Sequence, residues 1–215
     1  MDIYIISLDF VGVIVSKDFI DYFWLDLVPY AYSLKHKTPF EKAREIVYEE
    51  YSKVGEDKVE WYLIDFWAKR FNIEEYIPTL LNMASTKIHV YDDVFEVLPI
   101  LASRVRSIII LTNTTTPFID LFFSKYPELR KLIKKIYSCV SHYGIPRKTR
   151  EFYEIVIKEL NVEPSKIVHV GDDPLYDYDI PRSLGINAII IARGEAKVKN
   201  KRDAITSLRE LLKVV

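Results

Sequence analysis

Short runs of apolar residues, separated late in the chain by amphipathic stretches, most strongly limit the folds open to this sequence. They lie at residues 3–8, 107–111, 136–140, 166–170 and 187–191. The first, second and fifth are nearly continuous in Ile and Leu, which is typical of parallel strands buried on both faces. Helices are expected at residues 116–134, 150–160, 175–184 and 203–215, the last with Asp203 as N-cap. Alternating strands and helices predict an α/β fold with a doubly wound parallel sheet, a Rossmann-like core.

Residues 16–85 interrupt this alternation because they contain no strand-like run. Apolar side chains recur there at helical spacing, as in the series Phe19, Phe23, Leu27, Ala31 and Leu34. We therefore expect a bundle of about four helices inserted after the first strand. The predicted division is a core of residues 1–15 and 87–215 and a helical cap of residues 16–86.

Composition excludes several classes of protein. The chain is 49% hydrophobic and 28% charged with a net charge of −1, so it has neither the bias of a disordered segment nor the positive charge that favours nucleic acid. No apolar run approaches the ~20 residues that span a bilayer. A single cysteine, Cys139, and a start that lacks a basic signal-peptide region lead us to expect a cytoplasmic protein. The absence of glutamine and the abundance of charged residues lead us to expect a thermophilic source.

Polar residues follow the ends of four predicted strands. They are Asp9 after the first, Thr112 and Asn113 after the second, Arg147 and Lys148 in the loop after the third, and Asp172, Asp173 and Asp177 after the fourth. In a parallel sheet these ends share one edge, where functional groups collect. The acids there can hold a hard divalent cation, and the hydroxyl and the cations can bind phosphoryl oxygens. His169 is predicted to pack within the fourth strand.

This ordered set resembles the haloacid dehalogenase superfamily, and the resemblance covers essentially the whole chain, including a helical cap after the first motif. Residues 9–13 match the first motif, Asp-x-Asp-Gly-Thr, at Asp9 and Gly12. Thr112 and Asn113 match the second motif, and residues 171–173 with Asp177 match the fourth at every fixed position. The resemblance implies that Asp9 is the nucleophile and that Mg²⁺ binds Asp9, the Val11 carbonyl and Asp172, with Asp177 in support.

The cation of the third motif has two candidates. Counting back from Phe152 and Tyr153 places Arg147 at the family's Lys position and Lys148 at its Pro position. Lys148 can take the role if the loop shifts by one residue. Arg is a planar fork and Lys a point charge, so the two would hold a phosphate differently. Both remain candidates from the sequence.

Two family positions differ in the first motif. Val11 replaces the second Asp, which in family phosphatases is the general acid and base, and Val13 replaces the Thr. The family's dehalogenases also lack the second Asp, but they use no metal and lack the metal-binding acids of the fourth motif. Phosphonate-cleaving relatives carry a small residue there and a cap lysine that forms a Schiff base. Seven cap lysines are available here: Lys17, Lys35, Lys37, Lys42, Lys53, Lys58 and Lys69.

The resemblance thus implies a Mg²⁺-dependent phosphatase or phosphotransferase that acts on a small phosphorylated molecule through an aspartyl-phosphate. Thr112, Asn113 and either Arg147 or Lys148 would hold the phosphoryl group. We expect no nucleic-acid or membrane partner. The alternative is a catalytically impaired relative that binds a phosphorylated ligand or a protein partner, because Val11 removes the proton donor.

Overall fold

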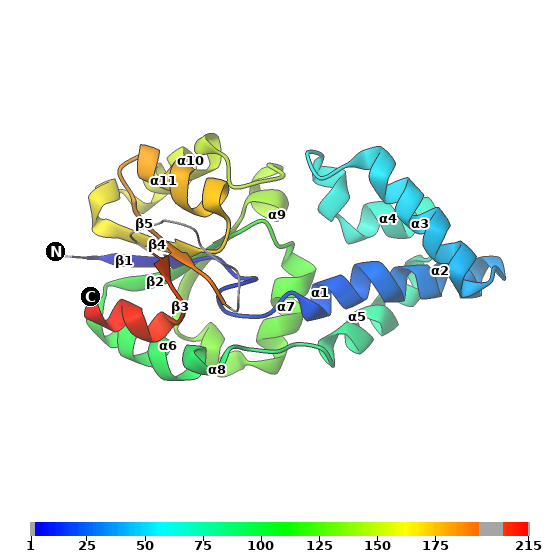
Figure 1. Cartoon of the computed structure of the whole chain (residues 1–215), viewed down its shortest axis with the longest axis horizontal. Helices are drawn as coiled ribbons and strands as arrows, with labels where there is room; N and C mark the ends of the chain where they lie inside the picture. The colour runs from blue at the N-terminus through cyan, green and yellow to red at the C-terminus, as the bar shows by residue number, and fades with distance from the viewer. Residues whose placement is uncertain (1–2, 194–203, 215) are drawn as a thin grey trace.

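The computed structural model describes residues 3–193 and 204–214 (Figure 1). Six parallel strands form one sheet in the order β3-β2-β1-β4-β5-β6. They are β1 (Ile5–Leu8), β2 (Ser107–Thr112), β3 (Ile133–Ser138), β4 (Ile167–Gly171), β5 (Asn187–Ile191) and β6 (Ala204–Ile205). This order is that of doubly wound folds, and its direction reverses between β1 and β4. The predicted α/β class is confirmed.

Both faces of the sheet are buried, as the continuous apolar runs indicate. Ile6 and Leu8 of β1 join one hydrophobic cluster, whereas Ile5 joins the cluster on the opposite face. Below the sheet in Figure 1 lie α6 (Asp92–Arg104), α7 (Thr116–Lys125) and α8 (Pro127–Arg130), and above it lie α10 (Arg150–Leu160) and α11 (Ile180–Ser183). Short segments complete the core: α9 (Cys139–Tyr143), the 3₁₀ helix η4 (Pro164–Lys166) and the π-helical η5 (Pro174–Asp179).

Two predicted helices of the core differ from the observed ones. The helix expected at residues 116–134 stops at Lys125, because Tyr126 precedes Pro127 and leaves the helical region at φ −127° and ψ 62°. Strand β3 consequently starts before residue 136. The expected helix 203–215 is wrong: the chain instead forms β6 and the 3₁₀ helix η6 (Leu208–Lys213), whose N-cap is Ser207 in a capping box with Glu210. The proposed N-cap Asp203 lies outside the described residues.

Helices between β1 and α6 extend to one side of the core, at the right of Figure 1, and we call residues 18–85 the helical insert. It comprises α1 (Asp18–Tyr22), the π-helical η1 (Phe23–Leu27), α2 (Val28–His36), α3 (Phe40–Val54), η2 (Val59–Tyr62), α4 (Ile64–Phe71), η3 (Glu74–Tyr76) and α5 (Ile77–Ser85). The predicted stripe is buried except at Leu34, which is 48% exposed. The π turns of η1 alter the regular 3.6-residue repeat on which that expectation rested.

The insert leaves and rejoins the core at neighbouring points. The backbone N–H of Ser16 donates to the His89 carbonyl at 2.9 Å, and Val15 and Val90 form an antiparallel bridge. The division into core and cap at residues 15–16 and 86–87 stays a prediction. Among the helices of the described residues, none is both long and apolar enough to cross a bilayer.

Candidate active site

Asp9 and Asp172 stand at the point where the strand order of the sheet reverses. Asp9 follows β1 and Asp172 follows β4, its direct neighbour. The Asp9 backbone N–H donates to the Val170 carbonyl at 2.8 Å, which fixes the first turn after β1 against β4. Doubly wound sheets bind ligands in the crevice at such a point. The two carboxylates therefore meet because β1 and β4 pair in this register.

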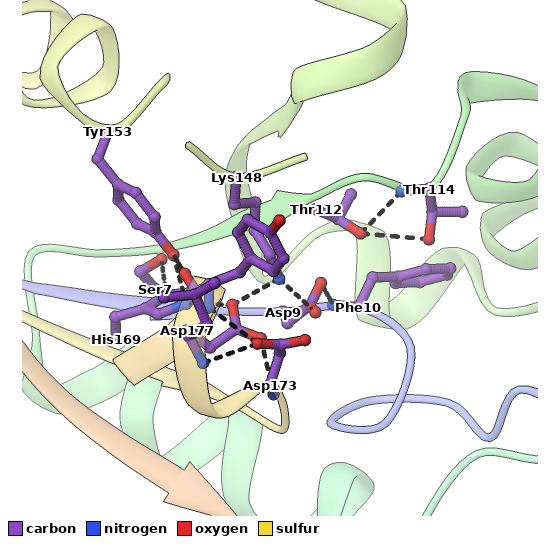
Figure 2. Close-up of polar contacts among 12 residues, drawn as sticks. Ser7, Asp9, Phe10, Thr112, Thr114, Lys148, Tyr153, His169, Asp173 and Asp177 are labelled. Atoms are coloured by element: carbon purple, nitrogen blue, oxygen red, sulfur yellow. Dashed lines mark hydrogen bonds and ion pairs between the residues drawn. The ribbon is translucent and has the colours of Figure 1, made fainter. Parts of the chain in front are cut away.

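Lys148 lies buried between two carboxylates, as Figure 2 shows. Its Nζ is 2.5 Å from Asp177 Oδ1 and forms a second ion pair with Asp9 Oδ2. Burial alone would lower the pKa of Lys148, but Asp177 and Asp9 raise it above its usual value. Burial would raise the pKa of Asp177, yet Lys148 and His169 hold it well below its usual range. Lys148 and Asp177 are thus charged at neutral pH.

The ion pairs of Arg147 and Lys148 differ, and they show which of these two candidate cations lies at Asp9. Arg147 points to the helical insert, where its Nη2 lies 2.7 Å from Glu56 Oε2 and its Nε 3.8 Å from Asp57 Oδ1. The Thr149 N–H donates to the Arg147 carbonyl at 2.7 Å, which closes a tight turn around Lys148. This turn is the one-residue shift that brings Lys148, rather than Arg147, to Asp9. Nothing in the sequence pattern singled out Glu56 and Asp57 as partners.

A buried polar chain holds Asp177 in place behind Lys148 (Figure 2). His169 Nε2 lies 2.9 Å from Asp177 Oδ1 and 3.1 Å from the Tyr153 hydroxyl, and Ser7 Oγ lies 2.8 Å from His169 Nδ1. The Tyr153 hydroxyl donates to the Tyr176 carbonyl at 2.8 Å. Because a carboxylate only accepts, the hydrogen of His169 belongs on Nε2. His169 is buried in β4, as predicted, whereas its hydrogen bonds to Ser7, Tyr153 and Asp177 were not predicted from the sequence.

Glycines beside the acids leave no room for a side chain. A Cβ on Gly12 would lie 2.2 Å from Asp172 Oδ2, and one on Gly171 would lie 2.2 Å from Asp177 Cγ. Gly12 also has φ +81°, which side-chain-bearing residues rarely adopt. Although Asp172 is an exposed residue, partial withdrawal of its carboxyl group from water and repulsion from Asp9 and Asp177 raise its pKa to about 7.

Three of these acids form a set suited to a cation. Oxygen atoms of Asp9, Asp172 and Asp177 all lie within 4.8 Å of one another. Lys148 supplies one positive charge to these three carboxylates, so the cluster is short of positive charge. Hard oxygen ligands and excess negative charge fit a divalent cation such as Mg²⁺. Val11, whose carbonyl was expected to be a ligand, lines the same cavity.

Most of the predicted site residues share this cavity, which we call the acidic cavity and which has a volume of about 200 Å³. Its lining comprises Asp9, Val11, Asn113, Arg147, Lys148, Asp172, Asp173, Tyr176 and Asp177. Thr112 is not part of that lining. It is fully buried, and its hydroxyl accepts from the Thr114 N–H at 3.1 Å and donates to the Thr114 hydroxyl at 3.2 Å (Figure 2). Thr112 therefore shapes the loop that presents Asn113.

Comparisons with known proteins agree with this geometry. No functionally curated protein matches the sequence. The structure is similar to a phosphatase of this superfamily from Thermococcus onnurineus (TM-score 0.81, 24% identity, 99% of this chain and 97% of that one). It is also similar to a 2-haloacid dehalogenase from Pseudomonas syringae pv. Tomato DC3000 (TM-score 0.67, 16% identity, 99% and 97%). The sequence model of haloacid dehalogenase-like hydrolases matches residues 5–185. The chain therefore belongs to the haloacid dehalogenase-like hydrolases.

Proposed function

We propose that this hydrolase is a Mg²⁺-dependent phosphatase or phosphotransferase that acts on a small phosphorylated molecule through an aspartyl-phosphate on Asp9. The observation that carries the proposal is the buried pairing of Asp9 with Lys148 inside the acidic cavity. A carboxylate at the sheet's switch point, beside a fixed cation and further acids, suits attack on phosphorus. A dehalogenase acts on a substrate without a phosphoryl group, so it does not need three acids that can bind a cation to neutralise phosphoryl charge.

In the first step the carboxylate of Asp9 attacks phosphorus, a new O–P bond forms, and the bond to the leaving group breaks. Burial raises the pKa of Asp9, and Lys148 opposes that rise by stabilising the carboxylate form. Lys148 also stays beside the phosphoryl oxygens as their charge shifts. Asn113, which lines the acidic cavity, is placed to donate to the same oxygens. In the second step water hydrolyses the aspartyl-phosphate and releases phosphate. Mg²⁺ held by Asp9, Asp172, Asp177 and the Val11 carbonyl would neutralise phosphoryl charge.

Val11 restricts which esters can react. It stands where family phosphatases have the acid, and an apolar side chain cannot give a proton to the leaving oxygen. A positioned acid or base typically contributes ~10²–10⁴-fold to rate. Alkyl phosphates, which expel strongly basic alkoxides, should therefore react slowly. Acetyl phosphate and p-nitrophenyl phosphate, which expel weak bases, should be the better donors.

The phosphonate-cleaving alternative has little support at the cavity. A second cavity, lined by residues of both the insert and the core, lies next to the acidic cavity. Of the seven cap lysines, Lys17 alone lines it. It is paired with Asp21 at 3.0 Å, and this hydrogen-bonded ion pair raises the pKa of Lys17. A Schiff base needs a neutral amine, so this pairing opposes that chemistry.

The test is to detect the aspartyl-phosphate itself. After incubation with acetyl phosphate and Mg²⁺ and an acid quench, intact-mass spectra should show one added phosphoryl group. Asp9→Asn should abolish the adduct, and Asp120→Asn, a matched change at an exposed acid of α7, should leave it. A different outcome is that the wild-type protein forms no adduct and hydrolyses neither acetyl phosphate nor p-nitrophenyl phosphate, yet binds inorganic phosphate in calorimetry. That result would support the alternative, a catalytically impaired relative that binds a phosphorylated ligand.

A further inference from the structure

A larger cavity of about 510 Å³ adjoins the acidic cavity, and we call it the aromatic cavity. The two share Val11 and Asn113 in their linings, so the larger space is open to the rest of a molecule whose phosphate lies at Asp9. Six aromatic side chains line it: Trp24, Tyr48, Tyr51, Trp61 and Tyr62 from the helical insert, and Phe118 from α7. The volume lies within the range of small-molecule sites in proteins.

Most ring pairs of this lining stand edge to face, whereas Tyr48 and Tyr51 are stacked, with ring centroids 6.3 Å apart at 21°. Ring centroids of Trp24 and Tyr51 lie 6.0 Å apart at 84°, and those of Tyr51 and Trp61 lie 5.8 Å apart at 65°. Phe118 meets Trp24 at 6.1 Å and 66°. Such walls offer both ring faces and ring edges, which is the arrangement that a further aromatic ring prefers. The lining thus suits a planar apolar guest.

Most of the surface that lines the aromatic cavity is apolar, and its charged and polar residues other than tyrosine and tryptophan are Lys17, Asp21, Ser52, Asn113, Thr114 and Thr115. Lys17 and Asp21 form an ion pair with each other, so the lining offers no net charge to a second phosphate or carboxylate. The Thr115 hydroxyl is buried and has no hydrogen-bond partner within residues 3–193 and 204–214. A sugar phosphate would lose water from several hydroxyl groups here and regain few hydrogen bonds. One polar substituent could pair with Thr115.

Resting on the proposed function, we propose that the substrate is an aryl phosphate, a phosphate ester of an aromatic hydroxyl group, whose ring occupies the aromatic cavity. Two independent features meet in this assignment. The cavity receives the ring, and Val11 contacts it where the family acid would otherwise protonate the leaving oxygen. Asp9 forms the O–P bond, and the P–O(aryl) bond breaks with its electron pair on the aryl oxygen. A phenolate is a weak enough base to leave unprotonated and then take a proton from water.

Three phosphate esters and one acyl phosphate separate the contribution of the ring from that of the leaving group. Phenyl phosphate has both a ring and a weakly basic leaving group, benzyl phosphate has only the ring, acetyl phosphate has only the leaving group, and ethyl phosphate has neither. With the full chain and Mg²⁺, kcat/KM should be higher for phenyl phosphate than for benzyl phosphate, because both carry the ring and phenolate is a far weaker base than the benzyl alkoxide. Benzyl phosphate should exceed ethyl phosphate by about tenfold through KM, because the ring contributes binding at the aromatic walls.

Binding without reaction gives a second readout. In titration calorimetry with Mg²⁺, phenylphosphonate should bind about tenfold more tightly than methylphosphonate. Trp61→Leu should reduce that ratio several-fold. Trp61 is half-buried, and its backbone carbonyl accepts the hydrogen bond of the Trp67 indole N–H, so the substitution leaves that hydrogen bond available. Tyr30→Leu is the matched control, since Tyr30 is 43% exposed on α2 and does not line the cavity, so the ratio should be unchanged.

The outcomes distinguish this assignment from the proposed function. Equal binding of the two phosphonates, with acetyl phosphate still labelling Asp9, would overturn the aromatic substrate and leave the phosphatase proposal standing. A loss of preference in Tyr30→Leu equal to that in Trp61→Leu would also overturn it. If no ester labels Asp9 but phenylphosphonate keeps its preference, the aromatic cavity is supported as a binding site and the phosphatase proposal fails.

Discussion

Replacing Lys148 by methionine should destabilise the protein more than any comparable change in its loop. The side chains of Lys148, Asp9 and Asp177 are 4%, 7% and 0% exposed, so Lys148→Met strands two buried carboxylates without their cation. Breaking a buried ion pair by removing one partner costs about 3–5 kcal/mol. The cost should be at the upper end, because one lysine serves both acids.

The neighbouring residue supplies the control. Arg147 pairs with Glu56 and Asp57, whose side chains are 65% and 92% exposed. Ion pairs with solvent-exposed acids contribute about 1 kcal/mol or less. The Arg147 side chain itself is 19% exposed, so Arg147→Met also loses some packing, but it should cost clearly less than Lys148→Met. Guanidinium denaturation at neutral pH with EDTA present, to remove divalent cations, measures both variants on the same scale.

The free energy of unfolding should depend on pH in opposite directions in the wild type and in Lys148→Met. In the wild type the pKa of Asp177 lies below its unfolded value, so its ion pair adds stability above about pH 4, which is lost as the pH falls through the folded pKa. In Lys148→Met, burial without a cation raises the pKa of both acids, and the variant loses stability as the pH rises above about 4. The stability difference should therefore shrink toward pH 4. Equal losses in Arg147→Met and Lys148→Met, or a difference independent of pH, would refute the argument.

Three further results are expected. Val11→Asp should speed hydrolysis of ethyl phosphate in steady-state assays, by at most ~10²–10⁴-fold, because it restores an acid beside the leaving oxygen; no gain would mean that another residue gives the proton. Titration calorimetry should show Mg²⁺ binding that Asp172→Ala severely weakens, and in the wild type the affinity should fall below about pH 7, where the metal must displace a proton from Asp172. Limited proteolysis should cut near Lys17 or near residues 86–87, which are exposed beside the buried bridge of Val15 and Val90, and it should cut faster in Glu56→Gln, which weakens the contact between Arg147 and the insert; cuts confined to the middle of the insert would contradict this.

The sheet and most of the acidic cavity follow from local sequence. Continuous Ile and Leu runs identify central strands, and the residue after each run reaches the shared edge, which is why Asp9 and Asp172 could be placed in advance. The choice between Arg147 and Lys148 could not be made, because it depends on a single tight turn at Thr149. The helix predicted at the end of the chain was also wrong. The two residues of β6 form a strand because they pair with β5, and their own sequence pattern does not indicate a strand.

Long-range partners were beyond prediction for a different reason. Glu56 and Asp57 meet Arg147 only through the orientation of the insert on the core, which no local periodicity encodes. The aromatic cavity likewise needs α3, η1 and η2 to converge on Phe118 of α7. Apolar spacing predicted the helices of the insert, and it carried no signal for which of their aromatic side chains would face a ligand.

The adjacent entry and exit of the insert have a consequence for the order of folding. β1 pairs with β2 between Ile5 and Ser107, so the centre of the sheet forms only when about a hundred residues are closed into a loop. Contacts within the insert, and the Ser16–His89 hydrogen bond at its base, bring the ends of most of that loop together. A chain in which the insert collapses first therefore faces a much shorter effective loop when β1 seeks β2. In kinetic terms, we infer that the insert, whose side chains line the aromatic cavity, also shortens the loop that must close before the sheet can nucleate.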